Sequence, residues 1–168
     1  SSLNAIPEPL LSYATAFPPG EVWINNTFRE KINPEIFEFN SIENLLLDTV
    51  TSHIPKEVNW GCSLSGGVDS SLLCALAKSK GHSFNCYTID TGGGLDLEAA
   101  KEVSSYLDLP LKLVKVTDLD IEKAFPKIVK SLGTFQSELI LGGLFTYFIS
   151  RKAYGDGLKV LLFGEGAD

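Results

Sequence analysis

Short runs of apolar, β-branched and aromatic residues alternate with longer amphipathic stretches from Asn40 to the end of the sequence. The short runs predict buried strands, because turn residues bound them and they are too brief for helices. The stretches between them repeat apolar residues at helical spacing. Regular alternation of strand and helix predicts a parallel sheet with right-handed crossovers and helices on both faces. We therefore expect an α/β fold with a doubly wound, mostly parallel sheet.

The positions of these runs predict the individual elements. Strands are expected at Val58–Leu64, Ser83–Ile89, Leu111–Val116 and Lys159–Phe163. Helices are expected from Asn40 onward, from Asp69 to Gly81, over Asp96–Leu107, on each side of Pro126, and over Ser137–Tyr154. The inward residues of the first two helices should be Ile42, Leu45, Leu46 and Val50, and Leu72, Leu73 and Leu76.

Two local signals refine these boundaries. Asn40 and Glu43 have the spacing of a capping pair at the start of the first helix. Pro126 should separate two helices, because proline fits the first turn of a helix and not its interior.

Residues 1–36 differ from the rest of the chain. Prolines punctuate them, and one short strand is expected at Glu21–Asn25. We interpret this segment as a linker or as the tail of a preceding domain. Residues 37–168 then form the main domain, since 168 residues suit a single ordinary domain.

Composition argues against several classes of protein. A net charge of −7 does not favour a nucleic-acid-binding surface, which needs a basic face. The sequence lacks both an apolar run of the roughly 18 residues that a membrane span needs and the pattern of a secretory signal. Its three cysteines form no C-x-x-C pair, which predicts buried thiols in a reducing compartment. We therefore expect a cytoplasmic protein that binds neither nucleic acid nor membrane.

The loop after the strand Val58–Leu64 has the sequence Ser-Gly-Gly-Val-Asp-Ser over residues 65–70. Small residues let backbone N–H groups approach an anion closely, and the amides of the following helix point to the same spot. This combination predicts a phosphate-binding loop. It is not a Walker A loop, because no Gly-Lys-Ser/Thr follows. Asp69 would repel phosphate without a cation between them and so suggests Mg²⁺. The alternative is a tight turn without a ligand.

A second loop, Gly164-Glu165-Gly166-Ala167-Asp168, follows the last strand. If the first and last strands of the sheet are neighbours, the two loops face each other across one crevice. Asp69 and Asp168 could then hold one metal ion together. The alternative is a solvated acidic turn.

Both loops resemble motifs of known enzymes. Ser65–Ser71, SGGVDSS, resembles the pyrophosphate loop of the ATP pyrophosphatases, or PP-loop superfamily. Leu161–Asp168, LLFGEGAD, resembles a motif of the branch that contains asparagine synthetase and β-lactam synthetase. Similar segments between them are Ser83–Cys86, Asp96–Val103 and Ser150–Lys152.

The resemblance implies a fold of the adenine-nucleotide α-hydrolase type, with ATP and Mg²⁺ as cofactors. The residues implied for ATP binding are Leu64, Ser65, Gly66, Gly67, Val68, Asp69, Ser70, Cys86, Phe163 and Gly164. Asp69 and Asp168 would hold Mg²⁺, and Glu165 would lie beside the reacting carboxylate and the incoming amine.

The reaction implied is amide formation from a small-molecule carboxylate. The carboxylate attacks the α-phosphorus of ATP, pyrophosphate leaves, and ammonia or an amine then displaces AMP from the acyl-adenylate. Pro18–Glu21 resembles the end of the glutaminase domain that precedes this fold in the family, so a glutaminase domain or subunit is a possible partner.

Several residues depart from the family pattern. Phe163 replaces a serine, and the stretch expected to bind aspartate, Thr134–Gly143, is largely apolar with Glu138 as its one charge. Aspartate is therefore not established as the substrate, and the resemblance to asparagine biosynthesis leaves the identity of the carboxylate open. Ser1 replaces the cysteine of the family's glutaminase, so these residues should not hydrolyse glutamine. The family continues beyond Asp168 with a further helical half. Two alternatives stay open: another PP-loop enzyme, similar to GMP synthetase or to tRNA-thiolating enzymes, or a nucleotide-binding or scaffolding protein without turnover.

Overall fold

The computed structural model describes residues 21–24, 27–31 and 41–165. The chain divides into two compact units, Ser1–Asn40 and Ser41–Asp168. In the first unit, β1 (Glu21–Ile24) pairs with β2 (Thr27–Lys31) in an antiparallel hairpin. The sequence predicted the first of these strands and missed the second.

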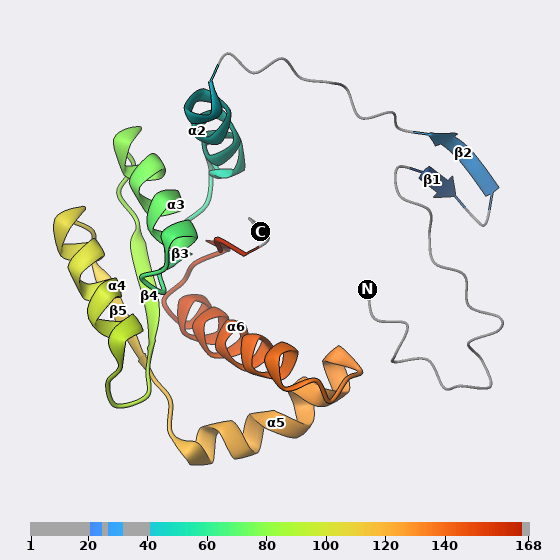
Figure 1. Ribbon diagram of the computed structural model, residues 1–168, viewed down its shortest axis with the longest axis vertical. Helices are drawn as coiled ribbons and strands as arrows, with labels where there is room; N and C mark the ends of the chain where they lie inside the picture. The colour runs from blue at the N-terminus through green and yellow to red at the C-terminus, as the bar shows by residue number, and fades with distance from the viewer. Residues whose placement is uncertain (1–20, 25–26, 32–40, 166–168) are drawn as a thin grey trace. The chain divides into compact units, whose positions relative to one another are not determined.

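The second unit contains a four-stranded parallel sheet (Figure 1). Its strands are β3 (Trp60–Ser63), β4 (Asn85–Asp90), β5 (Leu111–Lys115) and β6 (Val160–Leu162). Their order is β5-β4-β3-β6, and each neighbouring pair is parallel. The chain moves outward from β3 to β5 and then returns to add β6 on the other side of β3. This order confirms the predicted α/β class and places a reversal of strand order between β3 and β6.

Five helices of the second unit are described. They are α2 (Ile42–His53), α3 (Val68–Ser79), α4 (Leu95–Tyr106), α5 (Asp118–Leu132) and α6 (Ser137–Gly155). None of the helices in the described part of the chain is long and apolar enough to cross a membrane.

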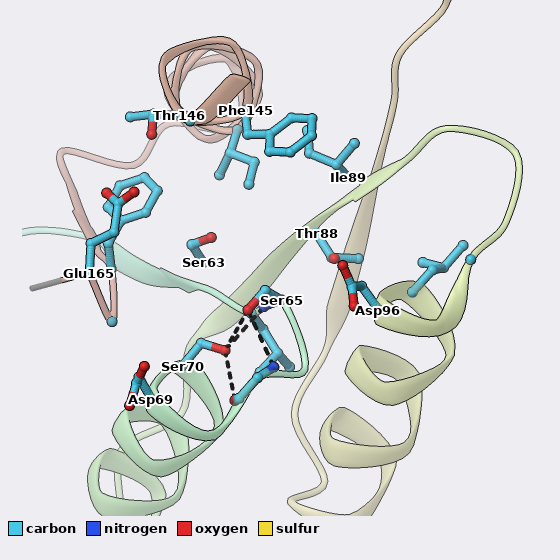
Figure 2. Close-up of a pocket in the computed structure, with 18 of the residues that line it drawn as sticks. Ser63, Ser65, Asp69, Ser70, Thr88, Ile89, Asp96, Phe145, Thr146 and Glu165 are labelled. Atoms are coloured by element: carbon cyan, nitrogen blue, oxygen red, sulfur yellow. Dashed lines mark hydrogen bonds between the residues drawn. The ribbon is translucent and has the colours of Figure 1, made fainter. Parts of the chain in front are cut away.

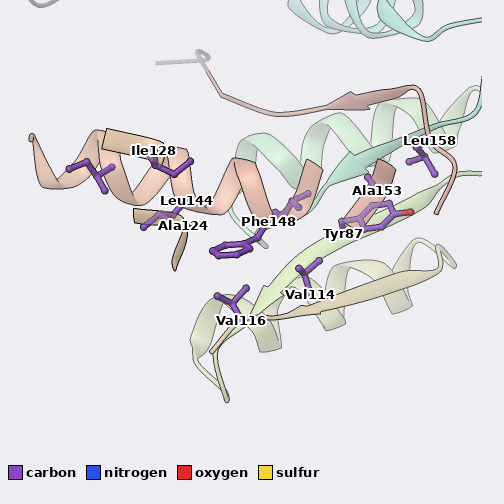
Figure 3. Packing of buried hydrophobic residues seen from close by; sticks show 11 residues of the cluster. Tyr87, Val114, Val116, Ala124, Ile128, Leu144, Phe148, Ala153 and Leu158 are labelled. Atoms are coloured by element: carbon purple, nitrogen blue, oxygen red, sulfur yellow. The ribbon is translucent and has the colours of Figure 1, made fainter. Parts of the chain in front are cut away.

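The helices cover both faces of the sheet, as predicted. Cys86 and Tyr87 are successive residues of β4, so their side chains point to opposite faces. Cys86 belongs to a buried cluster with residues of α3 and α4. Tyr87 belongs to a second cluster with residues of α5 and α6, as Figure 3 shows. The sheet therefore separates two cores.

The prediction that Pro126 separates two helices is wrong. A single helix, α5, runs through it from the capping box of Thr117 and Asp120 to Gly133, whose φ is +64°. An interior proline costs about 3 kcal/mol or more in a helix. Ala124 and Ile128, on either side of the proline, are buried in the core beside α6. Packing of this apolar face outweighs the local cost of proline.

The predicted inward faces of α2 and α3 are confirmed for Val50 and Leu73, which pack against the core, and need correction elsewhere. Ser41 caps α2 by accepting a hydrogen bond from the Asn44 amide at 3.1 Å, whereas Asn40 lies outside the described residues. Ile42 is 73% exposed, and α2 has no buried residue. The buried residues of α3 are Ser70, Cys74 and Ala77, while Leu72 is exposed. Small side chains thus face the sheet and let α3 lie close to it.

Candidate functional site

A cavity of about 650 Å³ lies at the carboxyl ends of β3, β4 and β6. This volume is within the usual range for small-molecule sites. Figure 2 shows the loop after β3 at its floor, the start of α4 on one side, and Phe145 and Thr146 of α6 above. The cavity therefore occupies the point where strand order reverses, as the fold predicts.

Hydrogen bonds between two serines hold the loop after β3 in shape. The Ser70 hydroxyl accepts from the Ser65 amide at 3.2 Å and donates to the Gly67 carbonyl at 3.2 Å. The two hydroxyl oxygens are 3.0 Å apart, and because the Ser70 proton serves Gly67, Ser65 is the donor between them. Figure 2 shows this network beneath the cavity. The loop is thus preformed.

The start of α3 is open to an anion. Gly67 is its N-cap residue, and no side chain caps the helix there. The first-turn amides and the positive end of the helix dipole are consequently available for a ligand. Gly66 is required for a different reason: its φ is +86°, and a Cβ atom there would lie 2.6 Å from the Cβ of Ala99 in α4.

The loop after β6 contacts the loop after β3 directly. A Cβ atom on Gly164 would lie 2.8 Å from the Ser70 amide nitrogen and 2.9 Å from the Asp69 carbonyl carbon. Such backbone contact is possible only because β3 and β6 are neighbours. The prediction that the two loops face one another is therefore confirmed for Gly164 and Glu165, which line the same cavity as Ser65.

Most of the predicted site residues line this cavity. Those that do are Leu64, Ser65, Gly67, Asp69, Ser70, Phe163, Gly164 and Glu165. Gly66, Val68 and Cys86 do not line it, and Asp168 lies outside the described residues.

Cys86 is a core residue. Its side chain is fully buried, and its Sγ atom lies 3.9 Å from that of Cys74. The hydrogen bond with Cys74, followed by burial, raises the pKa of Cys86, and contacts with Cys62 raise the pKa of Cys74. These thiols are therefore unreactive in the folded protein. Thr88 and Ile89, later in the same strand, line the cavity in place of Cys86.

Sequence reasoning missed the contribution of the loop after β4. Gly93, Gly94 and Asp96 line the cavity, and Gly92, Gly93 and Gly94 all have positive φ. The Gly92 amide donates to Asp90 Oδ1 at 2.9 Å, which fixes the turn. A run of three glycines after a strand beside β3 was the available signal. The residues from α6 carried no such signal, because that helix is distant in sequence.

The charge of the cavity is entirely negative among the described residues that line it. Asp69, Asp96 and Glu165 supply carboxylates, and the described lining has no Lys, Arg or His. An anionic ligand would therefore need a cation of its own. No group of three His, Cys, Asp or Glu in the described part of the chain could hold a metal ion. A metal here would take most of its ligands from the bound molecule, which suits Mg²⁺ with phosphates.

A comparison with known protein families finds a match that includes both loops. The profile of the family described as asparagine synthase matches residues 41–168. This chain belongs to the asparagine synthase family. The match covers the whole second unit, including both loops of the cavity.

Curated members of the family are similar over most of the chain. The glutamine-hydrolyzing asparagine synthetase of Brassica oleracea is 28% identical over 91% of this chain and 30% of its own length. Asparagine synthetase B of Escherichia coli, also glutamine-hydrolyzing, is 28% identical over 83% of this chain and 28% of its own. The chain thus spans about three tenths of the length of these relatives.

A solved structure is also similar to part of this chain. The NH3-dependent NAD synthetase of Campylobacter jejuni has a TM-score of 0.49 and 15% identity, covering 70% of this chain and 53% of its own.

Proposed function

We propose that this domain binds ATP and activates a small-molecule carboxylate as an acyl-adenylate, from which an amide is formed. The observation that supports this proposal is the backbone contact of Gly164 with Asp69 and Ser70. It brings the two family motifs into one cavity, one with open helix amides and the other with a carboxylate, Glu165.

The proposed pose of ATP follows from the polarity of the lining. The β,γ-pyrophosphate lies on the loop Ser65–Ser70 and the first turn of α3, whose amides attract anions. Phe163 is the apolar side chain beside the same loops and borders the adenosine, together with Gly164 and the backbone of Leu64, whose side chain is buried in the core.

Mg²⁺ is part of this proposal because the cavity lining is acidic. Asp69 would hold the ion, and Asp168 is proposed as the second carboxylate. The ion supplies neutralisation of the charge on the phosphates, as in other phosphoryl and nucleotidyl transfers. The fit rests on the absence of cationic side chains from the described lining.

The proposed reaction has two displacements. An oxygen of the substrate carboxylate bonds to the α-phosphorus, and the bond from that phosphorus to pyrophosphate breaks. An amine nitrogen then bonds to the acyl carbon, and the bond to AMP breaks. The amides of α3 hold the leaving pyrophosphate, and Glu165 accepts a proton from the amine. Holding the reactants together supplies much of the remaining rate.

The first test is nucleotide binding. ATP with Mg²⁺ should raise the Tm of the chain, and Asp69→Asn should abolish the rise, because it removes a carboxylate that holds the cation. Asp118→Asn is the matched control, since Asp118 also lies in the first turn of a helix but outside the cavity. An unchanged Tm of the wild-type protein with MgATP contradicts the proposal.

The second test is turnover. Pyrophosphate release on addition of candidate carboxylates would support the ligase. A preserved ATP shift without pyrophosphate release across the panel would instead favour a nucleotide-binding protein without turnover. One observation favours that second candidate: Phe163, which replaces the family's serine, lines the cavity itself.

A further inference from the structure

A second cavity, of about 470 Å³, lies between α5 and α6. It shares Gly142, Thr146 and Glu165 with the cavity described above. The two cavities therefore adjoin at the Glu165 carboxylate, the group proposed to lie beside the reacting centre. We call the second cavity the α5–α6 groove.

The α5–α6 groove has apolar walls and a negative charge. Ile128 and Leu132 of α5 and Leu139 of α6 form much of its wall. Glu138 and Glu165 are its charged residues, and no Lys, Arg or His occurs in its described lining. A carboxylate in the groove would be repelled by both residues, whereas an ammonium group would be attracted.

Two adjacent glycines of α6 shape the groove differently. A Cβ atom on Gly143 would lie 2.9 Å from Leu132 Cδ1 and 3.0 Å from Ile128 Cγ2, so Gly143 lets the two helices meet. A Cβ atom on Gly142 would meet only Glu165 Oε1, at 3.9 Å. Gly142 therefore leaves space beside the Glu165 carboxylate, where the two cavities join.

Glu138 lies on the same face of α6 as this opening. Glu138, Gly142 and Thr146 follow one another at intervals of four residues, which places them in one row along the helix. Glu138 is exposed, and Leu132 and Leu139 are 43% and 48% exposed, so a ligand can enter from solvent. A molecule that enters past Glu138 reaches Glu165 along this row.

We infer that the α5–α6 groove binds the nitrogen nucleophile, and that this nucleophile is a primary amine with an apolar substituent. The inference rests on the proposed amide-forming function and specifies its second substrate. The apolar wall would contact the hydrocarbon part of the amine, a contact that free ammonia cannot make. Glu138 would attract the ammonium form into the groove, at whose inner end the nitrogen reaches Glu165.

The proton balance of the step follows from this arrangement. The bound ammonium, R–NH₃⁺, gives one proton to the Glu165 carboxylate and becomes R–NH₂. Its nitrogen lone pair bonds to the acyl carbon of the adenylate, and the C–O bond to AMP breaks with its electron pair on AMP. The second N–H proton passes to solvent, which leaves R–NH–CO–R′. No oxidant or reductant is needed.

Binding of butylamine hydrochloride, measured by isothermal titration calorimetry on the full chain, tests the inference. Butylamine should bind saturably, and Glu138→Gln should weaken it about tenfold, the loss typical of one charge-assisted contact. Glu122→Gln is the matched control, because Glu122 is exposed on α5 outside the groove and should leave the affinity unchanged. Circular dichroism of each variant verifies its fold.

Three results would overturn the inference: no saturable butylamine binding, equal affinity in wild type and Glu138→Gln, or ammonium chloride binding as tightly as butylamine. The MgATP shift in Tm, measured on the same samples, distinguishes failure of this inference from failure of the proposed function. A normal MgATP shift in Tm without butylamine binding rejects only the inference that the groove binds an amine. Butylamine binding that depends on Glu138, without an ATP shift, rejects the ligase and leaves an amine site.

Discussion

The two faces of the sheet are packed in different ways. On the face of α3 and α4, the completely buried residues are Cys62, Leu64, Cys74, Ala77, Cys86 and Ala100, and all of them except Leu64 have small side chains. On the face of α5 and α6, the core consists mainly of large side chains, as Figure 3 shows; these include Tyr87, Ile128, Leu144 and Phe148.

The size of the core residues on each face relates to the part of the site that lies beside that face. The small residues pack α3 and α4 against β3 and β4, and the starts of both helices line the same cavity as the loop after β3. On the other face, large residues form the core beside α6, along which two cavities open. We therefore expect large-to-small substitutions to destabilise the protein most on the α5–α6 face. Added side-chain volume should destabilise it most on the α3–α4 face.

The largest expected effect is on the α5–α6 face. Phe148→Ala should lower the free energy of unfolding by about 3–5 kcal/mol, because it empties a buried aromatic volume. Phe135→Ala is the matched control, since Phe135 is 82% exposed and its loss should change stability by less than about 0.5 kcal/mol. Urea denaturation followed by circular dichroism measures both. Equal losses in the two variants would show that this face does not depend on large side chains.

An intermediate effect is expected on the α3–α4 face. Gly66→Ala should lower the free energy of unfolding by about 2–3 kcal/mol, since it adds a clash with Ala99 to the strain of a positive φ. It should also remove the MgATP shift in Tm, because α4 would be displaced from the loop.

Gly92→Ala is the control that separates the effect of the packing clash from that of backbone strain in Gly66→Ala. Gly92 has φ +101°, and a Cβ atom there would meet nothing within 4 Å. Its substitution should therefore cost only the backbone strain, about 1 kcal/mol. If Gly66→Ala and Gly92→Ala destabilise equally, close approach of α4 to the loop is not what Gly66 provides.

The same contrast explains what could be predicted from the sequence. Strand positions, the parallel sheet and the residues of the two loops could be predicted, because local patterns and short motifs encode them. The continuity of α5 through Pro126 could not, because packing against α6 overrides a local rule. Nor could the burial of Cys74 in place of Leu72, which depends on how closely α3 approaches the sheet.

The contribution of α6 to the site was also beyond local patterns. Gly142, Phe145 and Thr146 line the cavity only because the chain crosses back to add β6 beside β3. Glu165 could be predicted from its motif, whereas its position between two cavities depends on this crossover.

The smallest expected effect concerns the start of α5, on the face with large side chains. The Thr117 hydroxyl, at 2.6 Å, and the Thr117 amide, at 3.0 Å, both donate to Asp120 Oδ2. These bonds lower the pKa of Asp120 below its usual value. A lowered pKa in the folded state stabilises the protein above the unfolded pKa, near 3.9 for aspartate, and the contribution is lost as pH falls through the folded value.

Asp120→Asn should accordingly lower the Tm slightly at pH 7, and the difference from wild type should shrink as the pH falls below about 4 and through the lowered pKa of Asp120 in the folded state. Asp118→Asn, in the same turn but outside the capping box, is the control for general charge effects at the helix start. Thermal melts between pH 7 and pH 3 measure the difference. A Tm difference that persists undiminished at pH 3 would mean that the ionised carboxylate is not what stabilises this end of α5. The α5–α6 face would then depend on its buried side chains alone.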